Sequence, residues 1–233
     1  MTLSKTSGSV SEAGGTDSFT VVLDAQPSSD VVLSVESSDT GEATVAPATV
    51  TFTSGNWNTA QTITVAGVDD DLTDGNQTAT VTVSVVDGSS ADAFDPLADQ
   101  TVAVTNADDD SFGLSVVQSD GSTGTTESGD TDSFTVTLNT QPASDVVLSV
   151  TSSDTGEVTV APATVTFTSG NWNTAQTITV TGVADTVVDG TQNATVTLSV
   201  VDASSDDDYD SVADAAVSVT NAETDSTVAT TTT

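Results

Sequence analysis

The sequence predicts an all-β protein built from two similar antiparallel β-sandwiches in tandem. Val, Thr, Ile and Phe alternate with polar residues at a period of two along most of the chain, which is typical of half-buried strands. Turn-forming residues recur about every ten positions and no stretch has helical spacing, which excludes parallel βαβ units. An internal repeat then sets the number of domains.

The repeat is clearest in one stretch that occurs twice. The sequence TVAPATVTFTSGNWNTAQTITV occupies residues 44–65 and again residues 159–180, without one substitution. A shift of 115 positions aligns residues 16–110 with 131–225 without a gap, and roughly three-quarters of the aligned positions are identical. We therefore expect one sandwich over residues 1–110, a second over 111–226, and a Thr-rich tail at 227–233 that we interpret as a linker.

The alternation in the first copy predicts six strands, and a segment around Leu3 and Val10 adds a seventh. Pro47 interrupts the third strand, and residues 56–59 are expected to form a loop or a single helical turn. Seven antiparallel strands in about 100 residues are typical of a β-sandwich. In chain order, the six strands are expected at residues 19–23, 31–35, 44–52, 63–65, 79–85 and 102–104.

The few aromatic residues are the largest candidates for the two cores. The second copy repeats the same three positions as the first. Trp57 has an alternative interpretation as a platform for carbohydrate, but a plug that closes one end of the core is favoured. The predicted core anchors are Phe19, Phe52 and Trp57 in the first copy and Phe134, Phe167 and Trp172 in the second.

The charge of the chain is strongly one-sided. It has 35 Asp and Glu residues against a single basic residue, Lys5, and a formal charge of −34. Such a surface repels nucleic acid and anionic membranes, and no apolar run approaches the roughly 20 residues of a membrane span. The N-terminus lacks the apolar core of a signal peptide, so if the protein is exported we expect its signal to lie outside this segment.

Catalytic machinery is not visible in the sequence. There is no histidine or cysteine, which removes the commonest general bases, nucleophiles and transition-metal ligands. The single lysine leaves little scope for Schiff-base chemistry, and no nucleotide-binding or nucleophile motif is present. A pair of carboxylates of the glycosidase type remains formally open. We expect that the protein is not an enzyme.

The carboxylates gather in loops that a sandwich would bring to one end. In the first copy these are Glu12, the loop with Asp39 and Glu42, residues 69–74, and the terminal run 108–110. Hard cations such as Ca²⁺ take six to eight oxygen ligands, and acidic loops can supply them. With Lys5 as the one basic side chain, salt bridges cannot neutralise these loops.

These acidic motifs resemble those of the Calx-β domain. The resemblance rests on Ser11-Glu12, Ser38-Asp39, Asp69-Asp70-Asp71 with Asp74 downstream, and Asp108-Asp109-Asp110. It implies a seven-stranded immunoglobulin-like sandwich whose distal acidic loops bind Ca²⁺, in tandem copies typical of bacterial surface proteins and adhesins. The resemblance thus implies a bacterial or archaeal protein that is secreted or held at the cell surface. Carried over position by position, it implies the ligands Glu12, Asp39, Asp70, Asp74, Asp108, Asp109 and Asp110 in the first copy, and Glu127, Asp154, Asp185, Asp189, Glu223 and Asp225 in the second.

The second copy has lost three carboxylates of the first. Asp69, Asp71 and Asp109 are replaced by Ala184, Thr186 and Thr224, so we expect weaker or fewer ions there. The run 108–110 stands at the junction of the two copies, where a bound ion could fix the angle between them. The alternative is that all of these loops are solvated acidic surface, as in a protein adapted to concentrated salt.

Two functions without catalysis compete at this point. In the first, the segment is a stalk or spacer of a surface or adhesin-type protein, stiffened by calcium, and its partners are neighbouring repeats. In the second, it is a self-associating subunit of an extracellular filament or surface layer, assembled by strand addition, and its acidity is a halophilic or marine adaptation. Neither function involves nucleic acid or insertion into a membrane.

Overall fold

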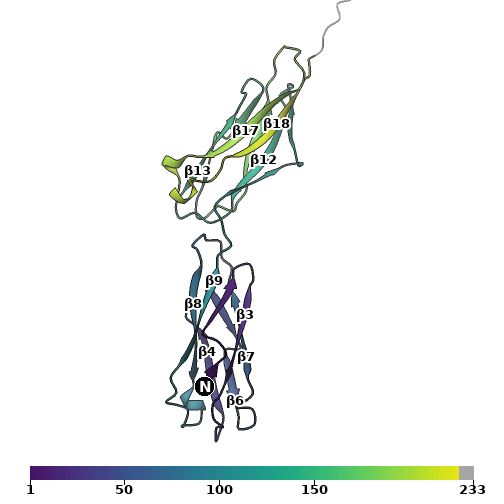
Figure 1. Cartoon of the computed structure of the whole chain (residues 1–233). Coiled ribbons are helices and arrows are strands. Elements are labelled where there is room, and N and C mark those ends of the chain that lie inside the picture. Colours follow the sequence, from purple (N-terminus) through teal and green to yellow (C-terminus); the bar gives the residue numbers. More distant parts are fainter. Residues whose placement is uncertain (226–233) are drawn as a thin grey trace, which may run out of the picture. The chain divides into compact units, whose positions relative to one another are not determined.

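The computed structural model describes residues 1–225, and the predicted tail at 227–233 lies outside the described residues. The chain divides into two compact units, Met1–Asp109 (unit 1) and Asp110–Thr233 (unit 2). Figure 1 shows an arrangement of strands in each unit that is almost free of helix. The predicted fold class, two tandem immunoglobulin-like sandwiches, is confirmed.

Unit 1 consists of two sheets. The four-stranded sheet has the order β1-β3-β7-β5, and the five-stranded sheet has the order β2-β9-β8-β4-β6. The strands are β1 (Thr2–Leu3), β2 (Ser7–Ser11), β3 (Thr16–Val22), β4 (Val31–Ser37), β5 (Ala43–Ala46), β6 (Thr49–Phe52), β7 (Gln61–Gly67), β8 (Gln77–Val85) and β9 (Gln100–Ala107).

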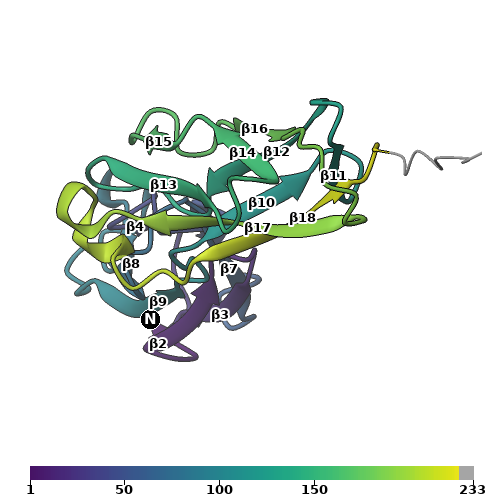
Figure 2. The ribbon, with the colours of Figure 1, turned by 90° about the horizontal axis from the view of Figure 1, so that it is seen from above.

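Unit 2 repeats this topology strand for strand. Its sheets have the orders β10-β12-β16-β14 and β11-β18-β17-β13-β15, and Figure 2 shows them from above. The strands are β10 (Leu114–Gln118), β11 (Thr123–Thr126), β12 (Thr131–Leu138), β13 (Val146–Ser152), β14 (Val158–Ala161), β15 (Thr164–Phe167), β16 (Gln176–Gly182), β17 (Gln192–Val200) and β18 (Ala215–Ala222).

In its described residues each unit has nine strands where seven were predicted, because two predicted strands are each divided between the sheets. The predicted strand at 44–52 splits at the cis bond Ala46–Pro47, so that β5 pairs with β7 while β6 pairs with β4. The N-terminal strand splits in the same way into β1 and β2. The pairing is antiparallel except between β2 and β9, which run parallel, as do β11 and β18.

The core of each unit is formed by the inward residues of both sheets. Five of the six predicted aromatic anchors are buried, and Trp57 is partly buried against the core of unit 1. One buried aromatic position was not predicted. Phe94 in unit 1 corresponds to Tyr209 in unit 2, whose hydroxyl donates to the carbonyl oxygen of Thr140 at 2.6 Å. The second core therefore contains a polar group that is satisfied by hydrogen bonding.

Among residues 1–225, helical structure is limited to three short 3-10 turns, η1 (Asp87–Ser89), η2 (Asp202–Ser204) and η3 (Asp207–Tyr209). In the part of the chain that the structure describes, no helix has the length and apolar character needed to cross a membrane.

One end of each sandwich gathers four segments that are far apart in the sequence. In unit 1 these segments follow β2, precede β5, connect β7 to β8 and follow β9. They lie together because β2 runs parallel to β9, and because β5 and β7 pair so that Ala43 lies opposite Gly67. Antiparallel strands in a sandwich thus place the ends of alternate strands at the same pole.

Gly67, the last residue of β7, allows this end to close. A Cβ atom at this position would lie 2.6 Å from Oδ1 of Asn106 and closer still to the carbonyl oxygen of Ser11. Gly182 has the same surroundings in unit 2, where Thr126 and Asn221 are the neighbours. Both contacts are closer than any real Cβ tolerates, so the backbone of β7 can approach β2 and β9 only with glycine here.

We predict that Gly67→Ala destabilises unit 1 by about 1–3 kcal/mol, the usual cost of forcing extra atoms into a packed site. The measurement is hydrogen exchange followed by mass spectrometry, which reports β7, β8 and β9 separately from their counterparts in unit 2. Gly88→Ala is the matched control, because nothing lies within 4 Å of its added Cβ and unit 2 already has Ala203 there. Equal protection in the two variants would contradict the close approach at Gly67.

Candidate metal centres

Each unit brings its carboxylates together in two groups of three. Within a group, one oxygen from each residue lies within 4.8 Å of the other two. Two oxygens on opposite sides of one Ca²⁺ are about 4.8 Å apart, so each group has the span of a shared ion. The first cluster of unit 1 is Glu12 and Asp108 with Asp110, the residue that directly follows unit 1, and the first cluster of unit 2 is Glu127, Glu223 and Asp225. The second clusters are Glu42, Asp70 and Asp74, and Glu157, Asp185 and Asp189.

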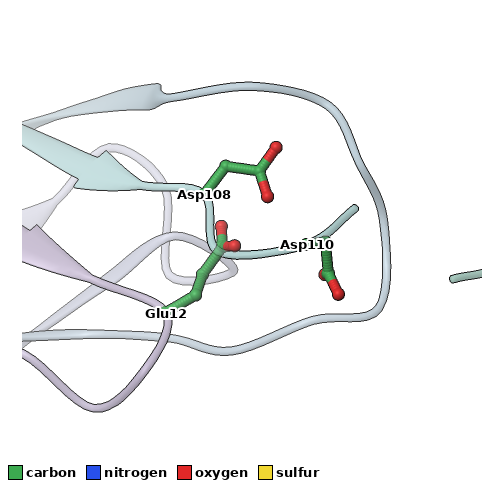
Figure 3. Close-up of side chains that lie close together, drawn as sticks. All are labelled: Glu12, Asp108 and Asp110. Carbon is green, nitrogen blue, oxygen red and sulfur yellow. The ribbon is translucent and has the colours of Figure 1, made fainter. Parts of the chain in front are cut away.

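The parallel pairing of β2 and β9 builds the first cluster of unit 1. Ser11 lies opposite Ala107 at the ends of these strands, so that Glu12 meets the segment with Asp108 and Asp110. Figure 3 shows Glu12 reaching from the end of β2 toward this segment. The carboxylate of Asp108 also accepts the backbone N–H of Gly75 at 2.7 Å, which ties the β7–β8 loop to the same place.

The second cluster of unit 1 depends on the pairing of β5 with β7. Glu42 immediately precedes β5, and its carbonyl oxygen accepts the N–H of Val68 at 3.0 Å, just after β7 ends. The next residues form the loop that contains Asp70 and Asp74. A hydrogen bond from the N–H of Leu72 to Oδ1 of Asp70, at 2.8 Å, stabilises the turn of this loop.

Glu12 is buried to an unusual degree for a carboxylate. Its side chain is 2% exposed, and its Oε1 accepts a hydrogen bond from Nδ2 of Asn106 at 3.2 Å. Its Oε2 is buried too and has no hydrogen-bond partner among residues 1–225. Buried polar atoms are almost always satisfied, and this oxygen, beside two other carboxylates, can be satisfied by a proton or by a cation.

Burial also raises the pKa of Glu12, to about 7. The backbone N–H of Asp109 lowers this pKa, while the negative charges of Asp108, Asp70 and Glu42 raise it further. The two clusters of unit 1 therefore act on the same carboxyl group, since these charges come from both.

Glu127 repeats this arrangement in unit 2. It is 2% exposed, and its Oε2 accepts the N–H of Thr224 at 3.0 Å, but its buried Oε1 has no donor within the described part of the chain. The N–H of Thr224 lowers the pKa of Glu127, yet burial and the neighbouring Glu223 raise it overall. The pKa of Glu223 is lowered, chiefly by the N–H of Gly190. A hydrogen bond between Glu127 and Glu223 requires one of them to be protonated, and the directions of the two pKa shifts place that proton on Glu127.

Basic groups do not balance these clusters. Of the two cationic groups in described ion pairs, Lys5 pairs with Asp17 and the N-terminal amine of Met1 pairs with Asp24. Neither aspartate belongs to a cluster. Six carboxylates therefore meet at one end of each unit without a basic side chain, and their mutual repulsion favours the binding of a cation.

The structure brings together most of the residues predicted as ligands, but not all. Asp39 and Asp154 lie outside the clusters, and each accepts the N–H two residues further on, at 2.9 Å, within a turn. Asp109 is also outside, with its side chain exposed. Glu42 and Glu157 were not proposed as ligands from the sequence, although their equivalence in the two copies was a usable signal.

The carboxylates that the second copy has lost are not cluster members. Ala184, Thr186 and Thr224 replace Asp69, Asp71 and Asp109, and all three aspartates have exposed side chains. Both units therefore keep two complete groups of three. The expectation of weaker binding in unit 2 remains a prediction, and it now depends on the charge around the clusters rather than on their members.

We predict that cation-free unit 1 becomes less stable as the pH rises from about 4.5 to about 7. The raised pKa means that folded Glu12 holds its proton more tightly than the unfolded chain does, and this stabilisation disappears as the pH passes the folded pKa. The measurement is urea unfolding in chelator, followed by tryptophan fluorescence. A Trp172→Phe background leaves Trp57 as the only tryptophan, so the signal reports the unfolding of unit 1. Glu12→Gln should flatten this pH dependence and the surface change Asp30→Asn should not; equal slopes would contradict the assignment.

No protein-family model and no curated protein matches the chain. Solved structures do show similar chains. The calcium binding domain CBD12 of CALX1.1 is 15% identical with a TM-score of 0.39, over 85% of this chain and 80% of that one. Domains 4 and 5 of the S-layer protein SbsC are 19% identical with a TM-score of 0.38, over 82% of this chain and 70% of theirs.

A third similar structure is SSP-19, an MSP-domain protein like family member in Caenorhabditis elegans. It is 15% identical with a TM-score of 0.35, over 46% of this chain and all of that one. These are likenesses of fold alone. The sandwich fold expected from the resemblance to Calx-β domains is the fold that the strand pairing itself shows.

Proposed function

We propose that each unit binds calcium at the acidic end of its sandwich, and that the chain is a non-catalytic structural segment of an extracellular surface protein. The observation that carries this proposal is the buried carboxylate of each first cluster, Glu12 or Glu127, with an oxygen that no donor in the described residues satisfies. A cation with several oxygen ligands would satisfy that oxygen and neutralise its neighbours.

Calcium is favoured over other metals by the chemistry of the ligands. The clusters offer carboxylates alone, and the chain has no histidine or cysteine for a softer metal. Magnesium keeps several waters and demands strict octahedral geometry, whereas Ca²⁺ accepts many protein oxygens in flexible arrangements. Loops from four separate segments therefore suit a Ca²⁺ site better than a Mg²⁺ site.

The structural role follows from the position of the first cluster of unit 1. Asp108 and Asp110 belong to the segment that leads from β9 to β10, so an ion held there orders the connection between the units. Small-angle X-ray scattering in calcium and in chelator tests this stiffening. A narrower distribution of interatomic distances in calcium supports it, and identical distributions at full occupancy contradict it.

A second candidate function, self-association by strand addition, has one observation in its favour. β10 is a five-residue edge strand with Val117 64% exposed, while its counterpart in unit 1, β1, has two residues. A long edge strand with an exposed apolar side chain can accept a strand from another chain. Sedimentation over a range of protein concentrations distinguishes the two candidate functions. A monomer at all concentrations favours the stalk, and association that Val117→Lys abolishes favours the filament.

We predict that calcium raises the free energy of unfolding of each unit through preferential binding to the folded state. The expected gain is about 2.7 kcal/mol for each filled site when calcium exceeds its Kd a hundredfold. Differential scanning calorimetry of chelator-treated protein with added calcium measures it. Asp70→Asn with Asp74→Asn should remove the contribution of one site.

Two controls make this experiment specific. Asp30→Asn and Asp39→Asn each remove a charge outside the clusters and should leave the calcium effect intact. Sodium chloride at matched ionic strength should stabilise the protein much less than calcium does. Equal stabilisation by the two salts would contradict specific sites and favour adaptation to concentrated salt.

A further inference from the structure

A buried asparagine joins the two clusters of unit 1. Asn106, near the end of β9, is 1% exposed. Its Nδ2 group donates to Oε1 of Glu12 at 3.2 Å, to Oε2 of Glu42 at 3.1 Å and to the carbonyl oxygen of Val68 at 3.0 Å. Glu12 belongs to the first cluster and Glu42 to the second, so carboxylates of both lie within hydrogen-bonding distance of one nitrogen.

The amide cannot serve all of these acceptors fully. An NH₂ group has two hydrogens, and here three oxygens converge on it, so Glu12 and Glu42 compete for the same donor. Both are carboxylates, and the charge of Glu42 acts on Glu12. In the cation-free protein, the orientations of the Glu12 and Glu42 side chains therefore depend on each other.

The equivalent asparagine of unit 2 serves a single cluster. Asn221 is fully buried and donates to Oε2 of Glu157 at 3.1 Å and to the carbonyl oxygen of Val183 at 3.3 Å. Both acceptors lie at the second cluster. Glu127 of the first cluster accepts the backbone N–H of Thr224, as Glu12 accepts that of Asp109, but only Glu12 is also bonded to the asparagine.

One substitution in the core distinguishes the two asparagines. Oγ1 of Thr125 donates to Oδ1 of Asn221 at 3.2 Å, which holds the amide from its other side. Unit 1 has Val10 at this place in β2, opposite Asn106, and Oδ1 of Asn106 is buried without a hydrogen-bond partner in residues 1–225. The orientation of Asn106 is thus set only through its Nδ2 group, by Glu12, Glu42 and the carbonyl oxygen of Val68, whereas Thr125 also holds Asn221 through Oδ1.

We propose that Asn106 couples the two cation sites of unit 1, so that they fill with positive cooperativity, and that the two sites of unit 2 fill independently. A cation in the first cluster takes over the oxygens of Glu12, frees the amide for Glu42 and removes the repulsion between the two carboxylates. The second cation then meets a cluster that is already oriented. This inference rests on the proposed calcium binding, and it makes Asn106 a positioning residue rather than a ligand.

The test is calcium binding by isothermal titration calorimetry on the full chain, with one unit silenced at a time. Asp185→Asn with Asp225→Asn disables one carboxylate in each cluster of unit 2 and leaves unit 1 to be measured. Asp70→Asn with Asp110→Asn is the matched pair at the equivalent positions of unit 1. With unit 1 active, we expect the first ion to raise the affinity for the second by about fivefold or more, and with unit 2 active, no such change.

Variants at the asparagine and at its partner then locate the coupling. Asn106→Leu should abolish the cooperativity while calcium still binds. Val10→Thr gives unit 1 the hydroxyl that unit 2 has, and it should weaken the coupling even if Asn106→Leu fails to fold. Thr125→Val should introduce coupling into unit 2. Changes of stability alone would not produce these opposite effects on cooperativity.

The outcomes separate this inference from the function on which it rests. Equal cooperativity in the two units, or coupling in unit 1 that survives both Asn106→Leu and Val10→Thr, overturns the role of Asn106 while calcium binding stands. Independent binding in unit 1 also overturns it. Absence of heat from calcium in both backgrounds overturns the proposed function, and the inference with it.

Discussion

Each unit buries a carboxylate that the chain itself cannot neutralise, and the acidic end of each sandwich is organised around this group. Glu12 and Glu127 are as buried as core residues, yet each lies beside further carboxylates and no basic side chain is near. Breaking up a buried ion pair typically costs 3–5 kcal/mol, because one charge is then left uncompensated. A fold that keeps such a group in two copies must either hold its proton or receive a cation.

The sandwich supplies the rigid frame for this constraint. Its cores hold the ends of β2, β5, β7 and β9 in fixed register, and the parallel pairing of β2 with β9 brings Glu12 to the segment after β9. The identical stretch shared by the two copies forms most of β5, all of β6, the Trp-bearing loop and most of β7. Its role is to build the scaffold, and the carboxylates stand just outside it.

The fold class could be predicted from the sequence because alternation and turn spacing depend on local chemistry. The division of two strands was not predicted, although the alternation shifts by one residue across Pro47: the inward residues are Ala43 and Val45 in β5 but Val50 and Phe52 in β6. The clusters were predicted in large part because acidic loops at one pole must meet. Glu42 was missed because its place in a cluster depends on the pairing of β5 with β7. Asp39 was included because the resemblance to Calx-β domains implied it, and its carboxylate instead accepts the N–H of Gly41 within its own turn.

Divergence between the copies gives the sharpest information about function. The acidic positions that differ most visibly between the copies, such as Asp69, which is Ala184 in unit 2, lie outside the clusters. The differences that change contacts at the site are Val10 against Thr125, buried in the core, and Asp108 against Glu223, which alters the reach of a carboxylate. Sequence inspection gives little weight to such changes, because a buried Val-to-Thr difference has no visible chemistry until its partner, here Asn221, is known.

The most direct test of the account is a crystal structure of the chain grown in calcium, with the ions located by anomalous scattering. The account predicts a peak in the first cluster of each unit, with oxygens of Glu12, Asp108 and Asp110, or of Glu127, Glu223 and Asp225, at about 2.3–2.6 Å from the ion. A map at saturating calcium without a peak at any cluster, and with Oε2 of Glu12 bonded to water alone, would contradict it.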